Sequence, residues 1–232
     1  MSKDSINTGE WKKTDSHLSA CIDSYYEYML KAALLFDDGD FKKMWLASYA
    51  AINAHLLDSS AAGFWYGHAD MNTGKRTKTW FGALDAFFPA VLALYGDVSR
   101  AGRLMQSCYG MWARFGIEPE QYNYATGAVE KAPYYLNPEI IESAYYLHKR
   151  TGDTVYLHMG KTFLDSLITY CRTDEGYAEL KSVITKEKSD RMEPYFMAET
   201  MKYLFLLFSP PEALPLDKVI FNTEAHPIRR TW

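Results

Sequence analysis

The sequence has little cysteine, no long apolar run and no cluster of basic residues. Its 3 cysteines, Cys21, Cys108 and Cys171, stand far apart without a CxxC pair, which argues against a disulfide framework or a zinc site. No apolar run of about 18 residues occurs, and residues 1–17 lack the apolar core of a signal peptide. With a formal charge of −4, neither nucleic acid nor an anionic membrane is an expected partner. The sequence itself does not fix a compartment.

Apolar and aromatic residues are abundant. Hydrophobic residues make up 48% of the 232 residues and aromatic residues 16%, including 18 Tyr and 6 Trp. This composition suffices for a large core, so we expect one globular domain over 18–232, preceded by a polar segment at 1–17. We assign most of the aromatic side chains to the core, although stacking on sugar rings would suit the same residue types.

Three similar junctions divide the chain into pairs of helices. Gly39, Gly96 and Gly152 stand at intervals of 57 and 56 residues (39 to 96 and 96 to 152), and each lies where one apolar helical pattern ends and another opens at an Asp. Such junctions predict tight αα-hairpins. First helices that are apolar nearly all round are expected at 22–36, 79–95, 138–150 and 191–208, and second helices with Lys and Arg on one side at 40–57, 97–115 and 153–171. The pattern predicts an all-α fold, an (α/α) barrel or toroid of helical hairpins of which about half is present.

The helix expected within 136–153 has signals at both ends. Asn137 is suited to the N-cap, Pro138 to the first helical position and Gly152 to a left-handed stop. Glu139 and Glu142 in its first turns are unusual on a helix that is otherwise apolar on most sides. Short β-hairpins are expected in the connections, at 64–67, 177–185 and 218–227.

Acidic residues recur at matching places in the first helices. Counted back from each junction, one rim carries Asp23, Glu139 and Glu193, and a second ring about one turn deeper comprises Glu27, Asp85, Glu142 and Glu199. Carboxylates that converge on an aromatic-lined mouth are what glycoside hydrolysis requires, whereas a lone acid near a helix N-terminus usually complements the helix dipole. Because seven acids share one side, we favour a site. We expect the dipole to hold Glu139 ionised, as a general base must be.

Two further acidic motifs have less weight. The run from Asp37 to Asp40 resembles a fragment of a calcium loop or a diphosphate motif, but its place between two helices favours helix capping. Thr223 and Glu224 offer oxygen donors in a turn after a predicted strand and could hold a hard cation.

Four ordered motifs resemble glycoside hydrolase family 47, the calcium-dependent α-1,2-mannosidases of N-glycan trimming. They are Asp-Ser-Tyr-Tyr-Glu-Tyr-Met-Leu-Lys at 23–31, Asn-Pro-Glu-Ile-Ile-Glu-Ser at 137–143, the run from Arg-Met-Glu-Pro-Tyr to Leu-Leu-Phe at 191–208, and Phe-Asn-Thr-Glu-Ala-His-Pro at 221–227. The segment at 79–89, Thr-Trp-Phe-Gly-Ala-Leu-Asp-Ala-Phe-Phe-Pro, looks most like the ER degradation-enhancing (EDEM-like) branch of the family.

The resemblance implies an (α/α)₇ barrel that removes terminal α-1,2-linked mannose from high-mannose glycans with inversion. By their places in the motifs, Glu139 corresponds to the general base, Asp23 to the second catalytic acid and Thr223 to a Ca²⁺ ligand. Mannose contacts are implied for Glu142, Glu193, Tyr195 and Glu199. The resemblance also suggests the secretory pathway or the ER lumen.

Two departures leave other functions open. Asn137 stands where the family has Arg, two residues before the base. The half of the family barrel that supplies the general acid lies outside this sequence, so we expect it to be completed by that half or by another chain. The alternatives are a mannose-binding protein without catalysis and a truncated product without a function of its own.

Overall fold

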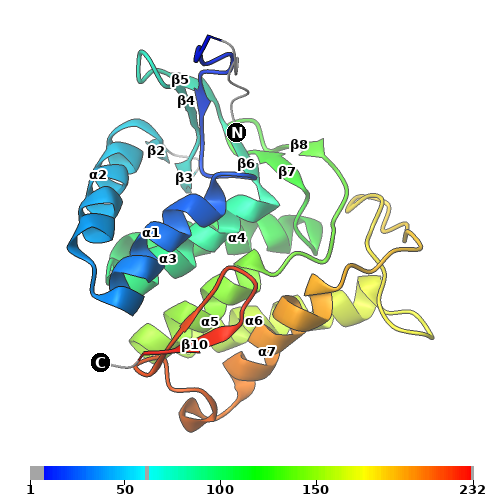
Figure 1. Cartoon of the computed structure of the whole chain (residues 1–232). Coiled ribbons are helices and arrows are strands. Elements are labelled where there is room, and N and C mark those ends of the chain that lie inside the picture. The colour runs from blue at the N-terminus through cyan, green and yellow to red at the C-terminus, as the bar shows by residue number, and fades with distance from the viewer. Residues whose placement is uncertain (1–7, 61–62, 231–232) are drawn as a thin grey trace.

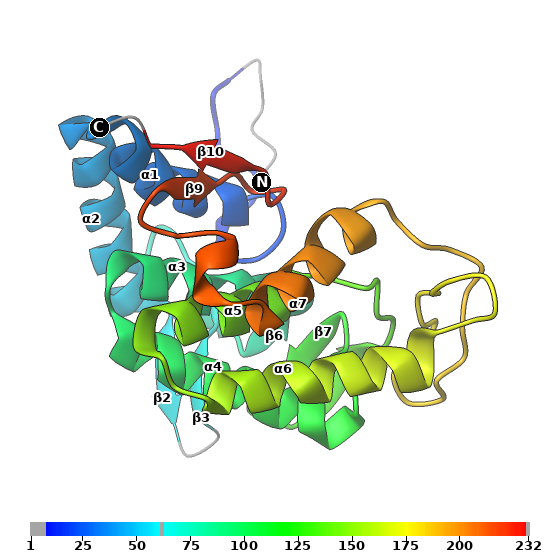
Figure 2. The same ribbon diagram turned by 90° about the horizontal axis from the view of Figure 1, so that it is seen from below.

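The computed structural model of the chain describes residues 8–60 and 63–230. The predicted polar segment 1–17 therefore lies partly outside the described residues, and its described end forms strand β1 (Asp15–Ser16). Three αα-hairpins follow one another and a single helix completes the arc (Figures 1 and 2). These helices are α1 (Asp23–Phe36) and α2 (Gly39–His55), α3 (Phe88–Tyr95) and α4 (Val98–Phe115), α5 (Glu139–Thr151) and α6 (Val155–Ser166), and α7 (Met201–Phe208).

The first helices of the pairs form the inner layer. In α3 every residue from Phe88 to Leu94 is buried, as is every residue of α5 from Ile140 to Leu147. Helix α5 lies in the middle of the arc and packs against α3, α4, α6 and α7. Helices α2, α4 and α6 expose one side, as the charged residues of their sequences predicted. No helix in the described ranges is both long and apolar enough to span a bilayer.

The junctions use left-handed residues, and Asp38 and Asp97 cap α2 and α4 as predicted, whereas the N-cap of α6 is Thr154 and not Asp153. Gly96 and Gly152 have φ of 105° and 70°, the conformation that glycine adopts without strain. At the first junction Asp37, with φ of 51°, takes this role instead, and Gly39 is already helical. Asp38 then accepts hydrogen bonds from the amides of Asp40 and Phe41. The acidic run at 37–40 thus ends one helix and caps the next.

Short strands occupy the long connections between the pairs. The predicted hairpins at 64–67 and 218–227 are confirmed, as β2 (Leu57–Ser60) pairs with β3 (Gly63–Tyr66) and β9 (Val219–Phe221) with β10 (Pro227–Arg229). The hairpin predicted at 177–185 is wrong, since this region makes only isolated bridges. Two small sheets comprise β1, β4 (His68–Asp70) and β5 (Arg76–Lys78), and β6 (Trp80–Gly82), β7 (Gln121–Asn123) and β8 (Ala128–Lys131).

Three predicted helices have irregular ends. The region 79–95 begins as strand β6 and a 3₁₀ turn (Ala83–Phe87), where the Asp85 carboxylate accepts a 2.5 Å hydrogen bond from the Gly82 amide. A π-helical turn (Phe196–Thr200) precedes α7, and another (Leu167–Cys171) follows α6. The predicted cap of α5 is wrong, since Pro138 is the N-cap and no side chain caps the helix.

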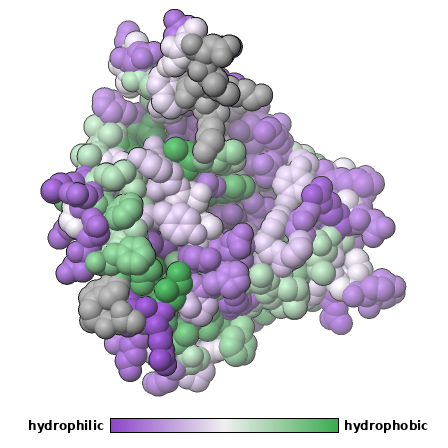
Figure 3. All heavy atoms as spheres, viewed as in Figure 1, coloured by the Kyte–Doolittle hydropathy of each residue, from purple (hydrophilic) through white to green (hydrophobic). Residues whose placement is uncertain are grey.

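Specific contacts hold neighbouring pairs together. The hydroxyl of Ser143 on α5 donates to the carbonyl of Ala86, at 2.5 Å, and accepts from the amide of Ala90, at 3.0 Å. The indole of Trp112 on α4 donates to Ser166 at 3.0 Å. Large apolar and aromatic side chains also remain exposed on α1 and α2, namely Tyr25, Tyr28, Phe36, Phe41 and Met44. Figure 3 shows hydrophobic surface among hydrophilic surface on one face of the molecule.

Candidate active site

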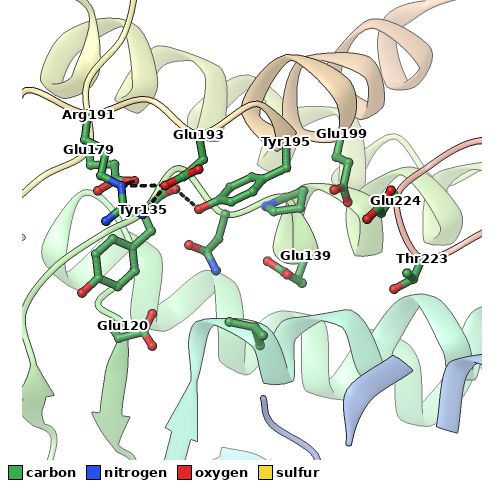
Figure 4. Close-up of a pocket in the computed structure, with 13 residues that line it drawn as sticks. Glu120, Tyr135, Glu139, Glu179, Arg191, Glu193, Tyr195, Glu199, Thr223 and Glu224 are labelled. Atoms are coloured by element: carbon green, nitrogen blue, oxygen red, sulfur yellow. Dashed lines mark hydrogen bonds and ion pairs between the residues drawn. The ribbon is translucent and has the colours of Figure 1, made fainter. Parts of the chain in front are cut away.

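A cavity of about 610 Å³ opens where α5 and the π turn before α7 begin (Figure 4). Six carboxylates line it, with Arg191 as the one cationic residue of the lining. The lining residues are Leu84, Glu120, Tyr135, Asn137, Pro138, Glu139, Glu179, Arg191, Glu193, Tyr195, Glu199, Thr223 and Glu224. The cavity is therefore strongly acidic.

A smaller chamber of about 30 Å³ adjoins this cavity. Four residues line both spaces, namely Pro138, Glu139, Glu199 and Thr223. The small chamber is lined by Asp23, Ser24, Glu27, Phe87, Pro138, Glu139, Glu142, Glu199 and Thr223. The structure thus brings together all seven residues predicted as site residues, with Glu193 and Tyr195 on the wall of the larger cavity. Asp85, placed in the deeper ring by its spacing, lines neither space because it is buried against Gly82.

The carboxyl of Glu139 is not held ionised as the helix dipole predicted. Burial raises its pKa well above the usual value, and Glu142 and Glu199 raise it further, although a backbone hydrogen bond lowers it in part. Its Oε2 atom is buried and has no hydrogen-bond partner among the described residues, while other parts of the side chain face the cavity. Desolvation and like charges therefore outweigh the dipole at this position.

The neighbouring acids share this environment. The pKa of Glu199 is raised to about 7, mainly by burial and secondly by the negative charge of Glu224. Burial raises the pKa of Glu142 to about 8, and the Tyr203 hydroxyl donates to its Oε1 at 2.9 Å. The pKa of Asp23 is also raised by burial, although the Ser24 amide partly opposes this. Carboxyls that interact in this way titrate as a group and not one by one.

The outer wall of the cavity is more rigid. The hydroxyl of Tyr195 donates to the carbonyl of Tyr135 at 2.6 Å. Arg191 forms an ion pair with Glu193 and approaches Glu179 at 3.7 Å (Figure 4). These contacts fix Glu193 and Tyr195 at the mouth.

Thr223 lies in the turn between β9 and β10, and this turn is tied to the first and last inner helices. The amide of Thr223 donates to the hydroxyl of Tyr28 on α1 at 3.1 Å. Lys202 on α7 donates to the carbonyl of Ala225 at 2.8 Å. Within the described ranges no group of three or more His, Cys, Asp or Glu could hold a metal ion. A cation here would bind oxygen donors such as those of Thr223, which suit Ca²⁺.

Sequence reasoning missed several residues in or beside the site, of which Glu118 is not part of either lining. Glu118 and Glu120 follow α4, and neither oxygen of Glu118 has a hydrogen-bond partner in the described part of the chain, although the residue is fully buried. The Oδ1 atom of Asn137 and the Oε2 atom of Glu120 are likewise buried and unpaired. The signal available in the sequence was two acids within an otherwise apolar connection, Phe-Gly-Ile-Glu-Pro-Glu at 115–120. Arg191, Glu179 and Tyr135 gave no periodic signal.

An arc of αα-hairpins with carboxylates at one mouth is the architecture of an α/α-barrel glycosidase. The sequence profile of glycosyl hydrolase family 47 matches residues 2–230, and the chain belongs to this family. It is 36% identical over 226 residues to alpha-mannosidase I MNS5 of Arabidopsis thaliana, covering 97% of this chain and 38% of that protein. It is 39% identical over 223 residues to the human ER degradation-enhancing alpha-mannosidase-like protein 3, covering 95% of this chain and 24% of that protein. The chain thus spans well under half the length of these relatives.

Solved structures show the same fold. The α-1,2-mannosidase from Trichoderma reesei superposes with a TM-score of 0.84 at 24% identity, over 96% of this chain and 54% of that one. A D-mannose isomerase superposes with a TM-score of 0.68 at 14% identity, over 95% of this chain and 64% of that one. The predicted half of an (α/α) barrel is confirmed.

Proposed function

We propose that this chain forms the mannose-binding and water-activating half of an α-1,2-mannosidase that trims high-mannose N-glycans. The observation that carries this function is the excess of buried acceptors. Asn137 Oδ1, Glu139 Oε2 and Glu120 Oε2 have no hydrogen-bond partner in the described part of the chain, yet all three residues line the cavity. Unpaired acceptors beside a cavity favour an occupant rich in hydrogen-bond donors, and a sugar presents several hydroxyls. The names of the relatives point to mannose and to the ER lumen as the compartment.

The reaction would proceed with inversion. Glu139, once ionised, takes a proton from a water molecule that attacks the anomeric carbon, and Asp23 is the second acid at this face. Glu142 and Glu199 in the inner chamber, with Glu193 and Tyr195 at the mouth, would orient the sugar. The general acid that protonates the leaving oxygen would come from the half of the barrel that this sequence does not contain, or from another chain.

Thr223 would hold Ca²⁺, together with water and sugar hydroxyls. When bound, the cation would orient hydroxyl groups and offset the negative charge of the surrounding carboxylates. Titration with Ca²⁺ should raise the melting temperature by mass action. Thr223→Val, which removes the hydroxyl at nearly constant volume, should lose at least part of this rise. An unchanged rise in the variant would exclude the hydroxyl as a ligand.

Release of mannose from α-1,2-mannobiose by the barrel completed with its other half tests the catalytic function, with NMR to record the anomer formed first. We expect the inverted anomer, and Glu139→Gln should lower the rate about 10²- to 10⁴-fold, as loss of a general base does. Glu175→Gln, at an exposed acid remote from the cavity lining, is the matched control. Release that is unaffected by Glu139→Gln would contradict the assignment of the base.

Two observations favour a second candidate, a mannose-binding protein without turnover. Asn137 supplies no positive charge beside Glu139, and burial raises the pKa of Glu139, which opposes the ionised form that a base needs. This candidate predicts that the chain binds methyl α-D-mannopyranoside without releasing mannose from α-1,2-mannobiose, even at alkaline pH. Mannose release that increases as the pH rises would exclude this candidate and support the catalytic function.

A further inference from the structure

Lys31 is a buried cation that lies outside the cavity, one helical turn beyond Glu27 on α1. The residue is only 3% exposed, and lines neither the large cavity nor the inner chamber. Its ammonium forms an ion pair with Glu27 and lies 3.9 Å from Oε1 of Glu142 on α5. The substrate could not touch this group, whereas both of its carboxylate partners line the inner chamber.

The cation connects two helices that are not direct neighbours in the arc, since α3 lies between α1 and α5. The Oε1 atom of Glu142 that faces Lys31 also accepts the 2.9 Å hydrogen bond from Tyr203 on α7. Lys31 thereby takes part in a chain of polar contacts from the first inner helix to the last. The ionisable groups around it are Glu27 on its own helix, Glu142 and Tyr146 on α5, Glu199 on the π turn and Tyr203 on α7.

We propose that Lys31 is a positioning residue that holds Glu27 and Glu142 in place behind the inner chamber and supplies the counter-charge of Glu27. Burial of a lone ammonium is costly unless it is paired and hydrogen-bonded. Although burial alone would lower the pKa of Lys31, Tyr146, Glu27 and Glu142 raise it, so the ammonium stays charged. Only the effect on mannose binding rests on the proposed function.

A double-mutant cycle on Lys31 and Glu27 tests the ionic role. Lys31→Met should raise the unfolding equilibrium constant at least ~100-fold at pH 7.5, because a buried carboxylate loses its partner. The unfolding equilibrium constant of the double variant Lys31→Met/Glu27→Gln should be at least ~10-fold lower than that of Lys31→Met. Should the single variant not fold, recovery of folding in the double variant is the same test. A double variant no better than Lys31→Met would overturn the role.

The matched control is another lysine paired with an acid four residues away. Lys161 and Asp165 on α6 lie 2.5 Å apart, but their side chains are 68% and 57% exposed. Lys161→Met should therefore change the unfolding equilibrium constant only a few-fold.

An NMR titration with methyl α-D-mannopyranoside tests the effect on the site itself. Folded Lys31→Met should bind the mannoside at least ~10-fold more weakly than the wild type, and Lys161→Met should bind it as the wild type does. Unchanged binding by folded Lys31→Met would overturn the positioning role. If the wild-type chain binds no mannoside, the proposed function fails and the stability cycle still decides the role of Lys31.

Discussion

Replacement of Glu118 by Gln should change how the stability of the protein depends on pH. Glu118 is fully buried, and neither carboxyl oxygen has a hydrogen-bond partner in the described chain. Burial raises its pKa well above the usual value, and Glu139 and Glu120 raise it further. Because the pKa is higher in the folded state than in the unfolded state, the folded state binds the proton more tightly. The resulting stability is fully present below the unfolded pKa and is lost as the pH rises toward the folded one.

The size of the effect follows from proton linkage. One proton bound by the folded state and not by the unfolded state changes the free energy of unfolding by about 1.4 kcal/mol per pH unit. Between pH 5 and pH 7 the contribution of Glu118 is therefore at most about 2.7 kcal/mol. Glu118→Gln removes this titration and keeps the shape of the side chain. The variant should lose less stability than the wild type over this range. Because Glu118 and Glu139 interact, the substitution should also lower the pKa of Glu139, and this change contributes to the measured difference in slope.

Urea denaturation followed by circular dichroism at pH 5, 6, 7 and 8 would measure these slopes. Glu175→Gln is the control, since the side chain is exposed and its removal should leave the slope of the wild type. If the Glu118→Gln and wild-type curves run parallel, the carboxyl of Glu118 has a partner or is ionised in the folded protein. The reasoning from burial would then be refuted.

The remaining predictions concern helix packing and the general base. A methyl group added at Gly160 on α6 would meet Leu207 on α7, whereas nothing lies within 4 Å of one added at Gly110 on α4. Gly160→Ala should therefore destabilise the protein by up to ~2 kcal/mol, as overpacking outweighs the gain in helix propensity, and Gly110→Ala should stabilise it by ~0.5–1 kcal/mol in the same urea assay. Asn137→Arg should place a cation beside Glu139 and lower its pKa, so mannose release, which needs the ionised base, should begin at lower pH. A pH profile that stays in place would show that the charge at position 137 does not control the base.

The pairing of helices could be predicted from the sequence because it depends on local signals. Glycine at left-handed positions and Asp at caps act within a few residues, so the junctions at Gly96 and Gly152 were found at the right places. The helix start at 79–95 was wrong because strand pairing of β6 with β7, a contact between distant residues, extends the chain there. The π turns likewise depend on how the last helices pack and not on local propensity.

The convergence of the acids could also be predicted, but their electrostatics could not. Spacing within the repeats placed Asp23, Glu139 and Glu199 at one mouth, where the cavity is found. The pKa of Glu139 depends on how deeply the carboxyl is buried and on its neighbours, which the sequence does not give. In the same way, Glu27 and Lys31 have the spacing of an ordinary surface pair, and only the fold shows that both are buried.

The turn that carries Thr223 has a mechanical consequence for the site. Its backbone is anchored to Tyr28 on the first inner helix and to Lys202 on the last, so it spans the concave side of the arc as a tie between the two ends. If the arc flattens or tightens, as it would when a second half docks against its edges, the turn must move with it. The curvature of the helical arc would then set the position of the Thr223 oxygens, and assembly of the barrel would be coupled to the affinity for the cation.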